Sequence, residues 1–344
     1  MLQTMILTGD LNFLQVSDPS VPFARIADRL READLVFGNL ECCLADPPPG
    51  YSFEREGFYA GPQAGEALKH GGFHAVGCAN NVTYGADQIR TSLTRLDDLG
   101  IKHTGAGLDR PAARAPIVME RGGVRFGFLQ YTSVFWPSGQ AAGEGSPGVA
   151  TIRAHTAYQP KVANRAGVPP IILTSADDHD LEEFSSDIAS LKGQADVVVS
   201  SHHWGQAEEV LQYQRQIAHV AVEAGADIVL GHGVHYPLAI EVFKEKPIFY
   251  GVGCFSFHTG HHGRVFGDWV GLMVRVILED GKVAQVTCSP VRHNERNETL
   301  IRSVQEEREA IERLVKLSQK FKTTLDTTGD AAIVWQKSDG KVQN

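Results

Sequence analysis

The sequence lacks the features that mark several classes of protein. No stretch approaches the roughly 18 to 20 consecutive apolar residues of a membrane-spanning helix. No block of Lys and Arg forms a nucleic-acid footprint, and the formal net charge is -9. The five cysteines contain no CxxC pair, and Cys42 and Cys43 are adjacent, which suits neither a zinc knuckle nor a disulfide framework. We therefore expect no membrane span, no nucleic-acid partner and free buried thiols.

The beginning of the chain shows no targeting signal. Residues 1–8 form a short apolar run that passes directly into Gly9 and Asp10, without a basic segment or a cleavage site. The composition, 42% hydrophobic and 21% charged, is that of a globular protein with ample material for a core. We expect a soluble, cytoplasmic protein, and nothing in the sequence indicates its oligomeric state.

Short apolar runs alternate with amphipathic segments along most of the chain. We predict strands at residues 5–8, 34–37, 74–77, 171–174, 196–200, 227–230, 248–252 and 272–278, and a hairpin of residues 117–120 and 124–131. Helical spacing is found at residues 21–31, 64–69, 86–99, 181–191 and 212–223. Near-continuous apolar strands between helices predict buried strands in a layered α/β fold.

The last part of the chain has a different pattern. Residues 298–320 predict a charged helix, which is followed by a polar tail with one apolar run at residues 331–335. We predict a catalytic domain at residues 1–297, with residues 298–344 packed on it as a helix and tail. Residues 137–148 are rich in Gly, Pro, Ser and Ala and predict a loop.

Polar side chains of metal-ligand type follow five of the predicted strands. In open α/β sheets, ligands bind outside the carboxyl ends of strands. A single Asp or Asn at such a place is usually a helix cap or turn residue, and a lone His is usually structural. The occurrence of such residues after five different strands favours a metal site. Mixed oxygen and nitrogen donors suit Mn²⁺, Fe²⁺ or Zn²⁺. These candidates are Asp10, Glu41, Asn80, Asn81, His202, His203, His232 and His235.

Longer motifs surround these residues in a recognisable order. They are Gly9-Asp10, Gly38-Asn39-Leu40-Glu41, Ala79-Asn80-Asn81, Gly105-Ala106-Gly107, His203-Trp204-Gly205, Gly225-Ala226-Asp227, Gly231-His232-Gly233-Val234-His235, Pro247-Ile248-Phe249-Tyr250 and Gly253-Cys254-Phe255. Over residues 5–260 this order resembles the capsule and poly-gamma-glutamate synthesis protein (CapA) family, within the calcineurin-like metallophosphoesterase superfamily.

The resemblance implies a four-layer α/β/β/α sandwich that holds one or two divalent metal ions. It makes Asp10 a ligand of the first metal and Glu41 a bridging carboxylate. Asn81, His203, His232 and His235 are the remaining candidate ligands, and Asn12 stands where the superfamily often has a histidine. Neighbours in a strand point to opposite faces, so we expect His203, and not His202, to reach the metal.

The chain also departs from the family pattern. Many relatives have a histidine directly after the two asparagines, thought to act as general acid, whereas this chain has Val82. Cys254 stands where relatives often have asparagine. Either another residue supplies the proton, or the chemistry is not phosphoester cleavage.

Several residues are candidates to bind substrate or replace the missing acid. His258, His261 and His262 lie in a Gly-rich loop near Arg264, and histidines can transfer protons near pH 7. We select Asp10, His235 and His258 as catalytic candidates, and Tyr131, Trp136 and Arg264 as substrate-binding candidates. The alternatives are a solvated surface loop for the histidines and core packing for the aromatic residues.

Three functions are compatible with these residues. The first is a metal-dependent hydrolase of a phosphoester or of a poly-gamma-glutamate-like amide, using water activated by the metal. The second is a metal-dependent epimerase that exchanges an α-proton of a peptide or amino acid. The third is a metal- or ligand-binding module without catalysis. For the two enzymes we expect a small-molecule or peptide substrate.

Overall fold

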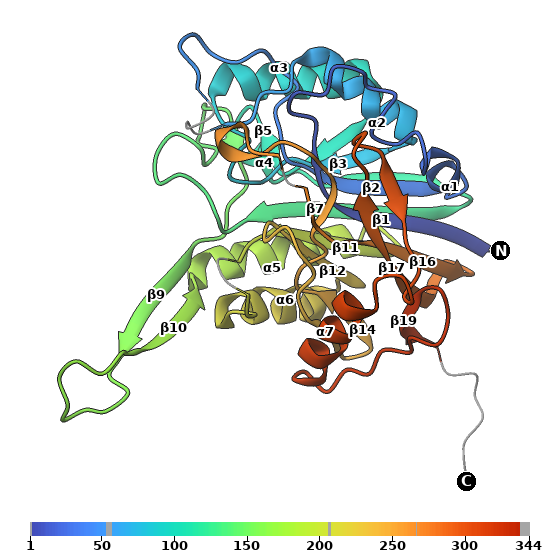
Figure 1. Ribbon diagram of the computed structural model, residues 1–344. Coiled ribbons are helices and arrows are strands. Elements are labelled where there is room, and N and C mark those ends of the chain that lie inside the picture. The colour runs from blue at the N-terminus through green and yellow to red at the C-terminus, as the bar shows by residue number, and fades with distance from the viewer. Residues whose placement is uncertain (1, 53–56, 206–207, 266, 338–344) are drawn as a thin grey trace.

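In the computed structural model, which describes residues 2–52, 57–205, 208–265 and 267–337, two large β-sheets face each other and helices cover their outer surfaces (Figure 1). The first sheet has the order β18-β17-β16-β1-β2-β3-β4, with β15 also pairing with β1 and β19 with β17. Strands β1 to β4 and β15 are parallel, and β16 to β19 run antiparallel to their neighbours. Their bounds are β1 (Leu2–Asn12), β2 (Leu35–Leu40), β3 (Ala75–Gly77), β4 (Lys102–Thr104), β15 (Cys254–Phe257), β16 (Gly271–Glu279), β17 (Lys282–His293), β18 (Thr299–Ile301) and β19 (Ala332–Gln336).

The second sheet has the order β13-β14-β12-β11-β7-β6. Strands β7, β11, β12 and β14 are parallel, and the two edge strands pair antiparallel with their neighbours. The bounds are β6 (Ile117–Arg121), β7 (Val124–Thr132), β11 (Val197–His203), β12 (Ile228–His232), β13 (Ile240–Phe243) and β14 (Lys246–Phe249).

An apolar core fills the space between the sheets. Met5 and Leu7 of β1 are buried there, while Ile6 between them belongs to the core on the opposite face. This alternation follows from the two-residue period of a strand. Phe37 of β2 stacks on Phe128 of β7, with ring centroids 4.7 Å apart.

Helices form the two outer layers. The first sheet is covered by α1 (Ala27–Arg31), α2 (Glu66–Gly71) and α3 (Ala86–Asp98), preceded at α2 by the 3₁₀ turn η1 (Pro62–Gly65). The second sheet is covered by α5 (Asp178–Lys192) and α6 (Gln212–Ala224). The expected four-layer α/β/β/α sandwich is therefore confirmed. None of the helices in the described ranges has the length and apolar character needed to cross a membrane.

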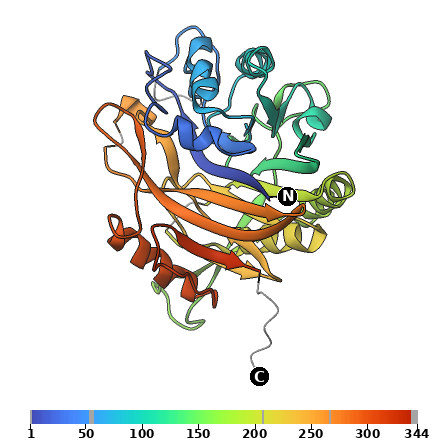
Figure 2. The ribbon, with the colours of Figure 1, turned by 90° about the vertical axis from the view of Figure 1, so that its right-hand side faces the viewer.

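The C-terminal part of the chain belongs to the first sheet. Figure 2 shows its orange and red strands beside the blue β1, although they are far apart in the sequence. The predicted helix at residues 298–320 starts later, at α7 (Arg308–Gln319), because residues Thr299–Ile301 pair with β17 as β18. Ile311 and Leu314 of α7 join the core between the sheets.

A two-stranded hairpin, β9 (Ala154–Gln159) and β10 (Ile171–Ala176), projects from the body (Figure 1). The prediction that residues 171–174 form a buried core strand is wrong, since Ile172 is 61% exposed. An apolar run of this length occurs both in core strands and in exposed hairpins, and its sequence does not separate them. The remaining elements are α4 (Arg110–Ala113), β5 (Ala106–Gly107), β8 (Gly148–Val149) and the 3₁₀ turn η2 (His261–Gly263).

Candidate metal centre

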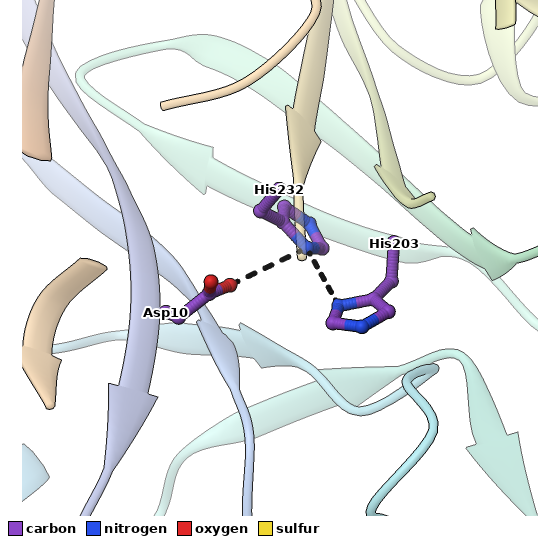
Figure 3. A group of neighbouring side chains, drawn as sticks. All are labelled: Asp10, His203 and His232. Carbon is purple, nitrogen blue, oxygen red and sulfur yellow. Dashed lines mark hydrogen bonds and ion pairs between the residues drawn. The ribbon is translucent and has the colours of Figure 1, made fainter. Parts of the chain in front are cut away.

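The ends of three strands bring an acidic and two imidazole side chains together (Figure 3). Asp10 lies near the end of β1, and His203 and His232 are the last residues of β11 and β12. The two histidines are partners in the parallel register of these strands, so their side chains share one face. One potential ligand atom from each of the three lies within 4.8 Å of the others, and all three side chains are buried.

The distances within this group are short. His232 Nδ1 lies 3.7 Å from Asp10 Oδ1 and 3.4 Å from His203 Nδ1. The side chains of Asp10 and His232 are 0% exposed. Burial, which disfavours the charged form, lowers the pKa of His203 to about 3 and that of His232 to about 4. Both rings are therefore neutral at pH 7, which is the form that binds a metal.

A second group shares Asp10 with the first. It contains His235 and Cys254, whose ligand atoms and one from Asp10 also lie within 4.8 Å of one another. His235 Nδ1 lies 3.2 Å from Asp10 Oδ2 and 3.5 Å from Cys254 Sγ. Glu41 is at the margin, with Oε1 at 3.9 Å from His235 Nε2. We did not expect a cysteine among the candidate ligands, and the structure adds one.

The turn after β12 positions the two C-terminal histidines of the site. Gly233 has φ 110°, and a Cβ there would approach the His203 ring to 3.0 Å. His235 has φ 54°, a left-handed conformation that costs about 1–2 kcal/mol in a residue other than glycine. Such strain is often retained at functional sites. The Gly-His-Gly-x-x pattern thus permits His203, His232 and His235 to approach one another.

The carboxylates of the site fit a bound cation. Asp10 Oδ2 and Glu41 Oε2 are buried and accept no hydrogen bond within the described ranges. Burial raises the pKa of the Glu41 carboxyl well above its usual range, and the charge of Asp10 raises it further. Burial also acts to raise the pKa of Asp10, but His235, His232 and His203 hold it well below its usual range. Two adjacent buried carboxyl groups and three imidazoles are a suitable donor set for a divalent metal ion.

A buried polar network supports these residues, and its main member was not predicted. Gln130 Nε2 of β7 donates to Asn39 Oδ1 at 2.8 Å and lies 3.2 Å from His232 Nε2. Asn39 Nδ2 donates to Asp10 Oδ1, and Ser201 Oγ lies 2.8 Å from His232 Nε2. A signal was present in the sequence, because Gln130 interrupts the apolar run of β7.

Two candidates from these strands point to the other face of the second sheet. His202 stacks on Trp204, with ring centroids 4.6 Å apart, and its Nε2 lies 2.8 Å from Ser200 Oγ. The hydroxyl of Tyr131 donates to the Asp187 carboxylate on α5. Both rings contact Phe184 of the same helix. The structure therefore brings His203 to Asp10 and places His202 and Tyr131 under α5, as strand alternation requires.

The asparagines have different environments. Both polar groups of the Asn80 side chain are hydrogen-bonded. Nδ2 donates to the Leu40 carbonyl, and Oδ1 accepts three hydrogen bonds from residues 82 and 83. The same is true of Asn12, because Oδ1 accepts from the Leu14 amide and Nδ2 donates to the Thr259 carbonyl. Asn81 is partly exposed, and its side chain makes no hydrogen bond to another described residue, so its amide oxygen remains a possible ligand.

The loop after β15 places its histidines differently. The His258 ring lies 5.9 Å from that of His293, and burial and this neighbour lower its pKa. The His261 ring lies 4.7 Å from that of Phe58, whose backbone amide donates to the Val82 carbonyl at 3.1 Å. Burial and then the charge of His235 lower the pKa of His261. His261, more than His258, is thus near both His235 and the position of the missing histidine.

The remaining candidates lie at the surface or in a separate cavity. Arg264 is exposed, and its backbone pairs with Gly260. Trp136 is 42% exposed, and its ring lies edge-on to that of Tyr84 with the centroids 6.3 Å apart. Tyr84 is close in sequence to Asn81. Tyr131 lines a cavity of about 310 Å³ together with Arg114, and none of the candidate metal ligands lines it. The guanidinium of Arg114 is already paired with Glu183 and Asp187.

The four-layer fold and the acid–imidazole group at its strand ends are the arrangement expected of a metallophosphoesterase-like fold. Residues 4–259 match the family described as bacterial capsule synthesis protein PGA_cap. The chain belongs to this family, which confirms the resemblance seen in its motifs.

Curated relatives agree with this assignment. The chain is 25% identical to a capsule biosynthesis protein CapA of Bacillus anthracis, over 93% of this chain and 70% of that protein. It is 26% identical to a PGA biosynthesis protein CapA of Bacillus subtilis, over 93% of this chain and 74% of the relative. It is 27% identical to an uncharacterized protein of Sinorhizobium fredii, over 74% of this chain and only 66% of that protein.

A solved structure shows a weaker likeness. It is described as a novel phosphatase of Mycoplasma pneumoniae, with a TM-score of 0.48 and 11% sequence identity, over 84% of this chain and 93% of that one.

Proposed function

We propose that this protein is a metal-dependent hydrolase whose cation binds between Asp10, His203 and His232. The observation that carries the proposal is the Asp10 carboxylate, which is fully buried beside three imidazoles and has one oxygen without a hydrogen bond. When bound, a divalent cation polarises the scissile group and strengthens water as a nucleophile at neutral pH. Mn²⁺, Fe²⁺ and Zn²⁺ suit the oxygen and nitrogen donors.

The chain's own residues have separate roles in this proposal. Asp10, His203 and His232 hold the cation, and His235 and Glu41 line the same centre. Ser201 orients the His232 ring by accepting a hydrogen bond from its Nε2–H, which leaves Nδ1 for the cation. Gln130 donates to Asn39, which in turn donates to Asp10. Outer-shell partners of this kind set the orientation of metal-binding histidines.

The substrate class is a phosphoester or an amide. The metallophosphoesterase-like fold favours phosphoesters, while the names of the Bacillus relatives indicate capsule or PGA biosynthesis, which favours γ-glutamyl amides. The test is to load the protein with each of the three metals and to assay both classes, with bis(p-nitrophenyl) phosphate and γ-glutamyl p-nitroanilide as substrates.

The control for this assay is a buried carboxylate outside the centre. Asp10→Asn should remove bound metal and lower turnover by roughly 10²- to 10³-fold, the size typical of losing one electrostatic stabiliser. Asp227→Asn should keep both, because Asp227 pairs with Lys192 and Lys246 at the far end of the second sheet. Full turnover in metal-free Asp10→Asn protein contradicts the proposal. So does exchange of substrate protons with deuterated solvent in the absence of cleavage, which is the behaviour of an epimerase.

We further propose that His261 donates the proton to the leaving group in place of the histidine that Val82 replaces. General acids contribute about 10²- to 10⁴-fold, and most when the leaving group is a poor one. His261→Gln should therefore lower turnover strongly for an alkyl phosphodiester and weakly for a p-nitrophenyl ester. His258→Gln is the matched control from the same loop, and an equal loss in both variants contradicts the assignment.

A further inference from the structure

Cys254 stands at a position where its thiol faces the candidate metal centre. It begins β15 and is the register partner of Asp10 on the neighbouring parallel strand β1. Register partners on adjacent strands present their side chains to the same face. Cys254 Sγ lies 3.5 Å from His235 Nδ1 and is within 4.8 Å of a ligand atom of Asp10.

Close backbone contacts hold Cys254 in this place. The Asp10 amide donates to the Gly253 carbonyl at 3.1 Å. A Cβ on Gly9 would lie 1.8 Å from the same oxygen, and one on Gly271 would lie 1.7 Å from the Cys254 carbonyl oxygen. Only glycine at residues 9 and 271 allows the backbone of residues 253 and 254 to lie so close. These contacts fix the Cys254 backbone, and its register with Asp10 sets the face to which the thiol points.

The Asn12 side chain of the same region is held by the backbone. Both of its polar atoms are hydrogen-bonded to backbone groups, the Leu14 amide and the Thr259 carbonyl, which hold the side chain in place. The fully buried Asp10 carboxylate has Oδ2 at 3.2 Å from His235 Nδ1, and one of its oxygens lies within 4.8 Å of Cys254 Sγ. An oxygen, an imidazole nitrogen and a sulfur then face one space.

We propose that Cys254 is a thiolate ligand of a cation held between Asp10, His235 and Cys254, beside the position between Asp10, His203 and His232. The thiolate makes this position prefer Zn²⁺, Fe²⁺ or Co²⁺ over Mn²⁺ and Mg²⁺. This inference rests on the metal centre of the proposed function. A metal–sulfur bond forms in place of the S–H bond, and the proton leaves to solvent. Thiolates select the softer divalent ions, whereas carboxylates and amides suit the harder ones.

The other cysteines provide internal controls. Cys42, Cys43, Cys78 and Cys288 are buried and free, and in the described ranges none of them joins a metal-type group. Cys288 is as fully buried as Cys254, but it lies in the apolar core between the sheets. Cys288→Ser therefore makes the same chemical change at equal burial without touching the centre.

The test is the absorption spectrum of the full chain loaded with Co²⁺. The wild-type protein and Cys288→Ser should show the near-ultraviolet sulfur-to-cobalt charge-transfer band, and Cys254→Ser and Cys254→Ala should bind cobalt without it. X-ray absorption of the Zn²⁺ form should show a sulfur at about 2.3 Å. Zn²⁺ affinity should fall in both Cys254 variants by at least the 10- to 100-fold typical of losing an outer-shell partner. Mn²⁺ affinity should change less.

The outcomes separate this inference from the proposed function. Tight cobalt binding without the band in wild-type protein overturns the Cys254 assignment and leaves the hydrolase proposal intact. Failure of the wild-type protein to bind any of the metals overturns both. Circular dichroism melting of each variant, compared with Cys288→Ser, shows whether a loss of metal comes from unfolding. If Cys254→Ser is unfolded, Cys254→Ala takes its place in the comparison.

Discussion

Gln130 is the residue that joins the two sheets at the candidate centre. Its Nε2 donates to Asn39, and its Oε1 accepts a hydrogen bond from the Ala79 amide at 2.7 Å. Gln130→Leu should lower metal affinity about 10- to 100-fold, because it releases Asn39, which donates to Asp10. It should also lower the free energy of unfolding by about 1–3 kcal/mol, because the buried Ala79 amide loses its acceptor.

The matched control for Gln130 is on α6. Gln216 also accepts from a backbone amide, that of Ala176, at 2.8 Å, but it lies outside the centre. Gln216→Leu should lose stability and keep its metal affinity in calorimetric titration. If both variants lose metal affinity equally, Gln130 has no orienting role beyond general stability.

The burial of His202 predicts that the folded protein loses stability in acid. Burial, and then the charge of His232, hold its pKa at about 3 in the folded protein, whereas a histidine in an unfolded chain titrates near ~6.5. Between these values the unfolded chain binds the proton and the folded protein does not. The free energy of unfolding therefore decreases as the pH falls from ~6.5 toward 3.

His202→Gln removes this contribution. Urea unfolding of metal-free protein should show a shallower loss of stability between about pH 6 and 4 than in the wild type. The exposed His179 of α5 is the control, and His179→Gln should keep the wild-type slope. An unchanged slope in His202→Gln contradicts the burial argument.

At the residue scale, the sequence predicted the acid and imidazole members of the centre but neither Gln130 nor Cys254. Asp10, His203 and His232 have the residue types and strand-end positions that indicate a metal site. Cys254 has no partner near it in sequence, since Asp10 approaches it only through the pairing of β1 with β15. Contacts of this kind depend on register, which local sequence patterns do not determine.

At the scale of the element, the turn after β12 should not accept a side chain at residue 233 without a loss of metal affinity. Gly233→Ala and Gly123→Ala both place a Cβ in a left-handed conformation, with φ 110° and 79°, at a cost of about 1–2 kcal/mol. Only the Cβ at residue 233 meets the His203 ring, whereas the Cβ at residue 123 meets no atom within 4 Å. Metal affinity should therefore fall in Gly233→Ala and remain unchanged in Gly123→Ala. Equal affinities in the two variants show that the turn does not position His203.

At the scale of the whole molecule, the layered fold was predictable because the central parallel strands are continuous apolar runs. Strands β17 to β19 of the first sheet were not, because β17 alternates between buried and partly exposed residues, and β18 and β19 are short and pair only with it. In the projecting hairpin, β9 is exposed along its whole length and only Thr174 and Ala176 of β10 are buried, so no regular alternation marks the two strands.

The most direct test of the metal centre is an anomalous difference map from crystals grown with Mn²⁺ or Zn²⁺. We predict a peak at about 2.0–2.3 Å from an Asp10 oxygen and a nitrogen each of His203 and His232. A map in which metal binds only elsewhere, leaving the Asp10 carboxylate without a metal, contradicts the account.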